Sequence, residues 1–337
     1  MKIAIHHREG SFSDRWIAYC EEKKIEYKIV NAYSSDIVQQ VEGCDTVMWH
    51  FHQSDYRDMQ FAKALILSLE TKGIRCFPNS KTCWHFDNKV WEKYLLEAIG
   101  APMVPSYVFY TKTEALRWTR STSFPKVFKL KGGASASNVR LAHTRKEAVK
   151  LIEQCFGKGF RHYRWQERFK ESLRKHKEGK ASLREVLRPI KYAFKRYPTQ
   201  FDHFHGREIG YAYFQDFIPN NDHDTRVVVI GGKRALGEIR YCRDGDFRAS
   251  GSGRFEYGNV DKQILSTAFE MAKKLQMQTV AFDFIMDNGR PLIVEISYGF
   301  GTHGISHSGG YWTDDLVWHE DKNLDFCGWM VEDLIKQ

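Results

Sequence analysis

Short apolar stretches alternate with amphipathic ones through the first hundred residues of the chain. The apolar stretches are rich in β-branched and aromatic residues and predict strands at residues 2–7, 27–33, 46–51 and 74–79. The intervening residues 13–24 and 59–73 have apolar positions at helical spacing, with Ser13 or Asp14 as a helix N-cap and Gly73 as a C-cap. Strands that alternate with helices predict an open parallel sheet covered on both faces.

The pattern changes further along the chain. A predicted helix at residues 88–100 and shorter elements up to residue 156 lead into a basic segment that is expected to be mostly helical. Turns such as IGGKR and MDNGR then separate several apolar stretches and indicate antiparallel hairpins. These stretches predict strands at residues 210–218, 225–232, 233–241, 279–287 and 290–298. The predicted fold class is therefore parallel α/β first and α+β afterwards.

The composition is typical of a globular protein and not of a disordered or membrane-spanning one. With 337 residues, 42% of them hydrophobic and 14% aromatic, the chain can form two globular domains. The start MKIAIHHREG does not have the pattern of a signal peptide, and no stretch approaches the roughly 18 apolar residues that span a bilayer. Seven scattered cysteines without a C-x-x-C pair fit a reducing cytosol, where most thiols pack as small core residues. We therefore expect a soluble, cytoplasmic protein.

The net charge of +9 is concentrated in one segment. Between Lys158 and Arg196 there are fourteen Lys and Arg against four Glu, which gives +10 and leaves −1 for the rest of the chain. Basic residues interleaved with aromatic ones suit a polyanion, a nucleotide diphosphate or an anionic membrane surface. A solvated helical hairpin with its aromatic residues packed inward explains the pattern at least as well. Nucleic acid is a weaker candidate, because no recognised binding module accompanies the charge.

The stretch VFKLKGGASASNV, residues 127–139, joins a lysine in an apolar strand to a glycine- and serine-rich loop. Such a backbone can turn several N–H groups towards one anion, and Lys129 and Lys131 add positive charge. The loop lacks the G-K-[ST] ending of a P-loop and the G-x-G-x-x-G spacing of a dinucleotide-binding fold. Taken alone, it is either a phosphate-binding loop or an ordinary flexible turn.

Acidic residues stand on two neighbouring strands near the end of the chain. Asp283 lies on one strand and Glu295 on the next, with Asn288-Gly289 turning between them, so the two carboxylates can face each other. Ser297 lies two residues after Glu295 and thus on the same strand face. Oxygen ligands of this kind suit Mg²⁺. The alternative is ordinary strand polarity with both acids facing solvent.

The order of the motifs is more specific than any one of them. A lysine strand, a Gly/Ser loop, the strand QDFIPN, the D-x-R of DTR and the two acidic strands follow one another. This order resembles the ATP-grasp superfamily of carboxylate–amine ligases, over about Asn79 to Tyr298. We expect an N-terminal α/β domain at residues 1–100, a lid subdomain at 101–210 with a basic helical insertion at 158–196, and a C-terminal antiparallel-sheet subdomain at 211–337.

The resemblance implies that ATP binds to a defined set of residues. Lys89, in DNK, matches the segment whose lysine reaches a nucleotide phosphate, and Lys129 matches the lysine between the adenine side and the α-phosphate. The closing loop over the β- and γ-phosphates would comprise Lys131, Gly132, Gly133, Ser135 and Ser137, although Lys131 is equally well explained as a solvated loop lysine. The adenine hinge and the ribose-binding acid would comprise Gln215, Asp216, Phe217, Ile218 and Asp224. The family often has Glu where Gln215 stands, and an amide oxygen can still accept from the adenine amino group.

The resemblance also implies catalytic residues. Arg226 matches the arginine that faces the transferred phosphoryl group, whose oxygens a guanidinium can bind bidentately. Arg248 and Ser250, in RDGDFRASGSGRF, match a stretch that contacts the reacting acyl phosphate.

The implied metal ligands are Asp283, Glu295 and Ser297, with two Mg²⁺ ions as the family expectation and Mn²⁺ as an alternative. The family's last ligand is usually Asn, in E-x-N, whereas this chain has E-I-S, and its usual proline-glycine turn is replaced by YGFG. These departures leave the geometry of the second metal open.

The implied reaction has two steps. A substrate carboxylate attacks the γ-phosphate of ATP to give an acyl phosphate and ADP, and an amine then attacks the acyl carbon and releases phosphate. Some ATP-grasp ligases amidate sugar carboxylates during capsular or other surface polysaccharide synthesis, and the similar layout favours a nucleotide-linked or lipid-linked uronic acid as the acid partner. A homodimer and peripheral membrane contact are further expectations. A kinase acting on a small-molecule hydroxyl and an ATP-binding module without turnover stay open as alternatives.

Overall fold

We describe the protein from a computed structural model, which covers residues 1–133, 138–161, 165–177, 179, 181–192, 199–249 and 253–336. The chain forms two compact units. Unit 1 contains residues 1–53, 57–104 and 218–337, and unit 2 contains residues 54–56 and 105–217.

Unit 1 begins with a four-stranded, fully parallel sheet in the order β2-β1-β3-β4. Its strands are β1 (Lys2–His6), β2 (Glu26–Val30), β3 (Thr46–Trp49) and β4 (Arg75–Phe77). The helices that connect and follow them are α1 (Phe12–Lys23), α2 (Ile37–Gln40), the π-helical turn η1 (Asp58–Ala62), α3 (Lys63–Thr71), α4 (Ser80–Cys83) and α5 (Lys89–Ala98). The predicted alternation of strands and helices is confirmed.

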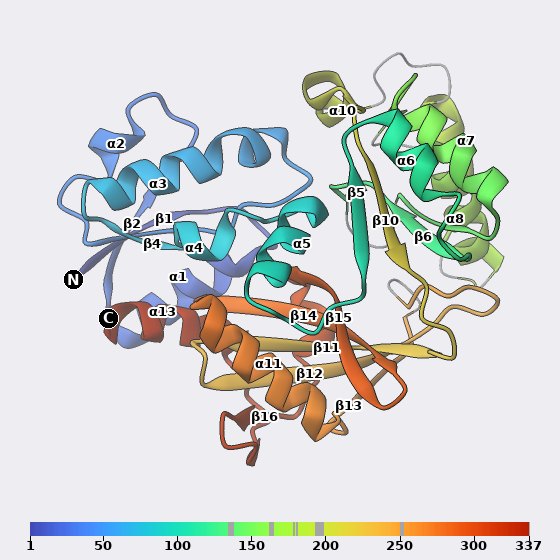
Figure 1. The fold of residues 1–337 in the computed structure, drawn as a ribbon. Helices are drawn as coiled ribbons and strands as arrows, with labels where there is room; N and C mark the ends of the chain where they lie inside the picture. The colour runs from blue at the N-terminus through green and yellow to red at the C-terminus, as the bar shows by residue number, and fades with distance from the viewer. Residues whose placement is uncertain are drawn as a thin grey trace. The chain divides into compact units, whose positions relative to one another are not determined.

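Both faces of this sheet are buried, as the sequence pattern predicted. Ile3 and Ile5 of β1 pack with Trp16 of α1 in one apolar cluster, while Ala4 between them packs in a second cluster with Ile66 of α3. The first cluster also contains the C-terminal helix α13 (Phe326–Lys336), which lies beside α1 (Figure 1). The two ends of the chain therefore share one core.

The second sheet of unit 1 contains seven strands, and β13 pairs beside the path β15-β14-β11-β12-β16-β17. Its strands are β11 (His223–Ile230), β12 (Arg234–Tyr241), β13 (Phe255–Tyr257), β14 (Thr279–Asp287), β15 (Arg290–Ser297), β16 (Gly310–Thr313) and β17 (Trp318–Glu320). All its pairings are antiparallel. The helix α11 (Lys262–Leu275) packs against one face (Figure 1), and the short helix α12 (Thr302–Ile305) follows β15. The edge of β15 is covered, because Val104 N donates to Ile293 O and Ile293 N donates to Pro102 O.

Unit 2 is built on a four-stranded antiparallel sheet in the order β5-β10-β6-β7. Its strands are β5 (Ser106–Phe109), β6 (Lys126–Lys129), β7 (Val139–Ala142) and β10 (Ala212–Asp216), with β8 (Phe160–Arg161) and β9 (Arg207–Glu208) paired separately. Its helices are α6 (Lys112–Trp118), α7 (Arg145–Cys155), α8 (Trp165–Lys177), α9 (Leu183–Leu187), the 3₁₀ turn η2 (Arg188–Tyr192) and α10 (Gln200–His205). Phe128, Phe214 and Ile152 belong to the core under this sheet.

One strand differs from the sequence-based prediction in its partners. Residues 210–218 resembled the hairpin strands that follow them, but β10 lies between β5 and β6 instead. Its pairing with β5 spans about a hundred residues of sequence, and no local turn signal can reveal such a contact.

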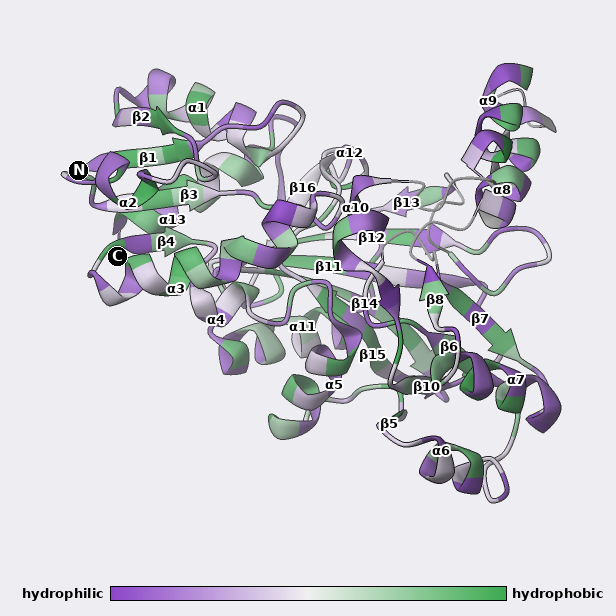
Figure 2. Ribbon diagram, turned by 90° about the horizontal axis from the view of Figure 1, so that it is seen from above, coloured by the Kyte–Doolittle hydropathy of each residue, from purple (hydrophilic) through white to green (hydrophobic). Residues whose placement is uncertain are grey.

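The basic segment is mostly helical where it is described, and α8 packs against α9 and η2, although Phe160–Arg161 at its start form β8. Hydrophobic and hydrophilic residues stand side by side along α8 and α9 in Figure 2. Six of the seven cysteines are buried and Cys242 is half-buried, which confirms their expected use as core residues. Within the described residues, no helix combines the length and the apolar character that a membrane span requires.

The core beneath the second sheet gives a first prediction. Phe282 on β14 is fully buried among the residues that pack on α11. Phe282→Ala should lower the free energy of unfolding by about 3–5 kcal/mol, because it removes apolar contacts and leaves a cavity. Urea denaturation measures this. Phe255→Ala, at a side chain that is 41% exposed, is the control and should change stability by less than about 1 kcal/mol. Equal losses in the two variants would contradict the assigned core.

Candidate active site

The second sheet of unit 1 has one apolar face, and its other face is apolar at one end, where Val228, Leu236 and Ala281 pack in the core shared with β1, and charged at the other end, which is called the charged face below. Val227, Phe282 and Ile296 pack with α11 on the apolar face. Side chains alternate along a strand, so the residues next to these point to the other face. The residues on the charged face are Asp224, Arg226, Glu238, Arg240, Asp283, Glu295 and Ser297.

The register of the strands arranges four of these charged residues in a row. Glu238 on β12 is opposite Arg226 on β11, Arg226 is opposite Asp283 on β14, and Asp283 is opposite Glu295 on β15. Directly opposite residues have Cβ atoms about 4.5–5.5 Å apart, so each side chain can reach its neighbours. The row follows from register, because a slip by one residue would turn these side chains towards α11.

Asp283 is held by two arginines. Arg226 binds it bidentately, with Nε 2.8 Å from Oδ1 and Nη2 2.9 Å from Oδ2, and Arg240 Nη2 lies 2.8 Å from Oδ2. Burial alone would raise the pKa of Asp283, but the two guanidinium groups outweigh it and hold that pKa below its ordinary value. Asp283 is therefore a fixed carboxylate at neutral pH.

Asp224 lies in the same array. Arg240 donates to both of its carboxylate oxygens, at 2.5 and 2.8 Å. Burial nevertheless raises the pKa of Asp224, and the nearby charge of Asp283 adds to the rise against the opposing effect of Arg240. Arg240 thus bridges two buried carboxylates, Asp224 and Asp283.

The helix α5 brings two more charges to Glu295. Asn88 caps this helix, since its side chain accepts from Val90 N and Trp91 N, and Lys89 follows in the first turn. Lys89 is buried, and its Nζ lies 3.0 Å from Glu295 Oε1. Burial alone would lower the pKa of Lys89, but the carboxylates of Glu295 and Glu92 outweigh it and raise that pKa above its ordinary value.

Glu92, one turn further along α5, is also buried, and its Oε2 accepts from Ile296 N at 3.4 Å. Burial raises the pKa of Glu92 well above its ordinary value, and the nearby charge of Glu295 raises it further. Glu238 is 4% exposed, and burial likewise raises its pKa, although Arg226 and Arg240 oppose the rise. Burial of these carboxyl groups therefore disfavours their ionised forms and makes the cluster less stable at neutral pH.

The donor set of this cluster suits a divalent cation. Five carboxyl groups (Asp224, Glu238, Asp283, Glu295 and Glu92) stand with three cations (Arg226, Arg240 and Lys89), so acids outnumber cations in this cluster. One Oε oxygen of Glu238 is buried without a hydrogen-bond partner. Hard oxygen ligands with excess negative charge fit Mg²⁺ or Mn²⁺.

The metal assignment nevertheless stays a prediction. Across the described residues, no three His, Cys, Asp or Glu side chains are grouped closely enough to hold a metal ion. Both carboxylate oxygens of Asp283 accept hydrogen bonds from guanidinium groups, and Ser297 Oγ donates to Gly299 O at 2.6 Å. These contacts would have to rearrange or be shared if Asp283, Glu295 and Ser297 bound a cation.

Arg248 lies in the loop after β12 and is bound to Asp246. Its Nη2 is 2.6 Å from Asp246 Oδ2 and its Nε is 2.9 Å from the same oxygen. These contacts fix the guanidinium within its own loop. Ser250 lies outside the described residues, so its expected role beside Arg248 stays a prediction.

The base of the glycine-rich loop is well defined in unit 2. Lys129 is buried in β6, opposite Tyr213 of β10. Lys131 N donates to Tyr211 Oη at 2.8 Å, Tyr211 Oη donates to the buried Glu208, and Lys131 Nζ lies 3.4 Å from that carboxylate. Lys131 is therefore an ion-paired residue and not simply a solvated loop lysine.

Two glycines follow Lys131 at the start of the expected closing loop. Gly132 and Gly133 are described, and Gly133 has a φ of 114°, a conformation that favours glycine. Ser135 and Ser137 lie outside the described residues. Their expected place in a closing loop over phosphates stays a prediction.

The hinge residues lie at the end of β10. The side chain of Gln215 is buried and its Nε2 donates to Ser106 Oγ at 3.1 Å. Asp216 forms an ion pair with Lys126, and its N–H donates to Pro105 O at 2.8 Å. Phe217 and Ile218 follow the strand. This contact uses the amide nitrogen of Gln215, so the expected acceptance from an adenine amino group by its amide oxygen stays a prediction.

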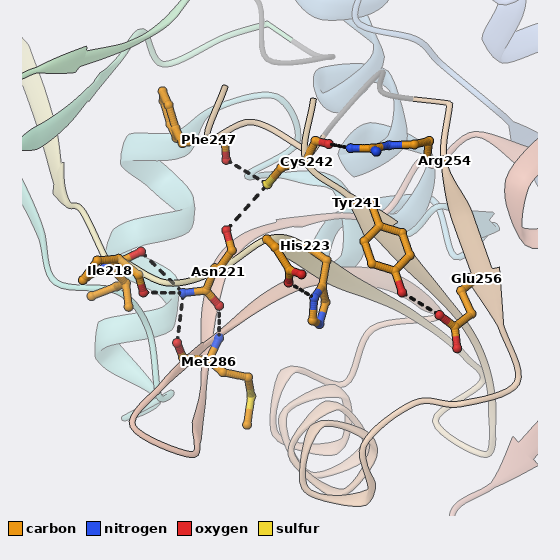
Figure 3. A network of polar contacts seen from close by, with 11 residues as sticks. Ile218, Asn221, His223, Tyr241, Cys242, Phe247, Arg254, Glu256 and Met286 are labelled. Atoms are coloured by element: carbon orange, nitrogen blue, oxygen red, sulfur yellow. Dashed lines mark hydrogen bonds and ion pairs between the residues drawn. The ribbon is translucent and has the colours of Figure 1, made fainter. Parts of the chain in front are cut away.

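An asparagine fixes the start of β11 in unit 1. Figure 3 shows the Asn221 amide donating to Met286 O at 3.0 Å and accepting from Met286 N at 2.9 Å. The Cys242 thiol donates to Asn221 O at 3.7 Å and to Phe247 O at 3.3 Å. The turn before Asp224 is thereby tied to β14 and to the loop after β12, which sets the register of the charged row.

Motif reasoning missed Arg240, Glu238 and Glu92. Glu238 and Arg240 stand in KRALGEIRY, which the sequence analysis treated as an apolar strand. Their alternation with Gly237, Ile239 and Tyr241 was the available signal, because two charges on one face of an otherwise apolar strand need partners. Glu92 gave no such signal, since surface glutamates are common on helices.

Comparisons with known proteins indicate which fold and family of domains the chain resembles. Residues 207–314 match the family model described as the RimK-like ATP-grasp domain. The chain is 22% identical over 330 residues to a protein of Cellvibrio japonicus named "Probable alpha-L-glutamate ligase", with 92% of this chain and 91% of that protein covered.

Solved structures share the whole fold. A RimK domain ATP-grasp protein from Sphaerobacter thermophilus superposes with a TM-score of 0.59 at 13% identity, covering 99% of this chain and 100% of that one. D-alanine–D-alanine ligase from Bacillus anthracis, solved in complex with ATP, gives a TM-score of 0.58 at 12% identity, covering 100% and 97%. The chain thus has the ATP-grasp fold, and the resemblance inferred from the motif order is confirmed.

The strained carboxylate of Glu92 gives a prediction about pH. Because the pKa of Glu92 is raised on folding, the folded state binds more protons above pH 4.5, and stability falls as pH rises from there towards the folded pKa. Glu92→Gln removes this fall and keeps an oxygen to accept from Ile296 N. It should raise the free energy of unfolding at pH 7 by about 1–3 kcal/mol.

Denaturant titrations between pH 4 and pH 8 measure this difference. Glu97→Gln is the matched control, because Glu97 is on the same helix but exposed and paired with Lys93. Such surface pairs contribute at most about 1 kcal/mol. A pH profile of Glu92→Gln that parallels the unmodified protein would contradict the strained carboxylate.

Proposed function

We propose that the protein is an ATP-dependent carboxylate–amine ligase. The observation that carries the proposal is the row Arg226–Asp283–Glu295, which lies on the part of the chain that matches the RimK-like ATP-grasp domain and has Lys89 of α5 at its end. The names of the Cellvibrio and Bacillus relatives, both ligases, support the same class of reaction.

The reaction would join a carboxylic acid to an amine while ATP becomes ADP and phosphate. ATP would supply the phosphoryl group that activates the carboxylate as an acyl phosphate, and Mg²⁺ would neutralise charge on the phosphates. The chain's part is to position charge. Arg226 would bind the transferred phosphoryl oxygens, and Lys89 holds Glu295 in place beside Asp283.

The residues of unit 2 keep the nucleotide roles that the resemblance implies. Lys129 would contact the α-phosphate, Lys131 and the glycines after it would close over the outer phosphates, and residues 215–218 would line the adenine. Their burial and strand positions support this assignment. No dedicated nucleophile is required, because the substrate carboxylate and the amine provide both nucleophiles.

The proposal leaves the substrates as a carboxylic acid and an amine. The three relatives described above are not named for a sugar acid, so they give the expected uronic acid no support. Glutamate, named for the Cellvibrio relative, is the first amino acid to test on either side of the amide bond. The homodimer that the family resemblance implies also stays a proposal.

An activity assay tests the ligase proposal. Purified protein with ATP, Mg²⁺ and pools of carboxylic acids and amines should release phosphate only when both an acid and an amine are present. Asp283→Asn and Glu295→Gln should each lower kcat at least ~100-fold, because each removes charge stabilisation at the reacting phosphates.

Asp287→Asn is the matched control, since Asp287 ends the same strand and accepts only from its neighbour Asn288 among the contacts described for it. Its kcat should stay within about twofold of the unmodified protein. ADP formation with a phosphorylated alcohol and no need for an amine would show a kinase instead. ATP binding with no turnover on any pool would favour the non-catalytic module.

A further inference from the structure

Glu238 is a buried carboxylate that the proposed chemistry does not use. It is 4% exposed, and none of the described residues donates a hydrogen bond to its Oε2. Burying an ionised carboxylate without a partner is costly, so natural proteins rarely keep one without a reason. Neither the motif order nor the comparisons assign this residue a role.

Its neighbours are the two arginines of the charged face. Glu238 is directly opposite Arg226 across β11 and β12, and Arg240 lies two residues further along its own strand on the same face. Both guanidinium groups form hydrogen bonds to other carboxylates, Arg226 to Asp283 and Arg240 to Asp224. Glu238 is therefore an unused acceptor next to two donors that are engaged elsewhere.

Arg226 is flanked by an acid on each side. Asp283 on β14 and Glu238 on β12 are both directly opposite it, so rotation of the Arg226 side chain alone can exchange one carboxylate for the other. At present Arg226 makes two hydrogen bonds to Asp283. A divalent cation on Asp283 would repel a guanidinium bound to the same carboxylate, because like charges a few ångströms apart repel strongly.

The surroundings of Glu238 argue against direct contact with a substrate. Gly304 of α12 covers the unpartnered oxygen so closely that a Cβ on this glycine would lie 2.2 Å from Oε2. A substrate ammonium group could not enter on that side while α12 keeps its place. The donors directly opposite Glu238 are Arg226 on β11 and Tyr257 on β13, and of these only Arg226 also faces Asp283.

We propose that Glu238 is a positioning residue that receives the Arg226 guanidinium when Asp283 binds the divalent cation. This inference rests on the proposed function, in which Asp283 and Glu295 are the metal carboxylates. Held by Glu238, Arg226 stays within the charged face, and its remaining N–H groups are free to bind phosphoryl oxygens. The carboxylate without a partner in the ligand-free protein gains one in the loaded protein.

The test measures metal binding and stability, without turnover. Mn²⁺ binding is titrated by electron paramagnetic resonance in the presence of a non-hydrolysable ATP analogue and without acid or amine substrates. Glu238→Gln should bind Mn²⁺ about tenfold more weakly, because an amide holds a guanidinium less well than a carboxylate does. The melting temperature of ligand-free Glu238→Gln should be unchanged or higher, since the variant removes a buried charge without a partner.

Weaker Mn²⁺ binding with an unchanged or higher melting temperature indicates a positioning role, because loss of a merely structural residue would lower both the Mn²⁺ affinity and the melting temperature. Glu238→Asp keeps the charge on a shorter side chain and should recover part of the Mn²⁺ affinity. Glu256→Gln is the matched control, because Glu256 on β13 is opposite Ile239 and so lies on the other face of the sheet. It should change neither measurement.

In steady-state assays Glu238→Gln should lower kcat and leave the KM of the amine unchanged. Mn²⁺ affinity within twofold of the unmodified protein, a destabilised ligand-free variant, or a raised KM for the amine with normal kcat would each overturn the inference. Asp283→Asn separates it from the proposed function. If Asp283→Asn keeps full Mn²⁺ affinity, the metal assignment fails; if it loses affinity and Glu238→Gln does not, only the role of Glu238 fails.

Discussion

The charged face of the second sheet depends on the pairing of Asp283 with Arg226 and Arg240. Five carboxylates and three cations lie together there, four of them buried and four partly exposed, and burial alone would favour neutral acids. The two guanidinium groups keep Asp283 ionised at the centre of the row. The other acids of the cluster are less well stabilised as carboxylates, since burial raises the pKa values of Asp224, Glu238 and Glu92. This imbalance is a cost in stability that a cationic ligand would relieve.

The rest of unit 1 serves to hold that face in register. α11 covers the opposite, apolar face, and the Asn221 network of Figure 3 ties the start of β11 to the end of β14. α5 packs beside β15 and places Lys89 and Glu92 next to Glu295 and Ile296. A site built on central strands keeps its geometry better than one built on loops, which suits chemistry that works by positioning charge.

Sequence reasoning found the elements but not their lateral arrangement. Apolar stretches with period two identified β11, β14 and β15, and the motif order identified Arg226, Asp283 and Glu295 as residues of one family pattern. It could not find that Arg226 stands between Asp283 and Glu238, because register across three strands depends on turns and on the bulge beside Asp283. The displaced strand β10 shows the same limit, since its partners are distant in sequence.

The position of Glu238 links these points. A carboxylate beside an arginine that already has a better partner adds nothing to the ligand-free fold, and it increases the excess of buried negative charge. A change of partner by Arg226 during function, as proposed above, accounts for its presence. Arg226 has two acceptors at equal register, and its choice between them can follow the charge on Asp283. The carboxylates of the charged face destabilise the ligand-free protein, and a bound cation would offset their negative charge. Glu238 would then have Arg226 as its ion-pair partner only in the metal-bound state.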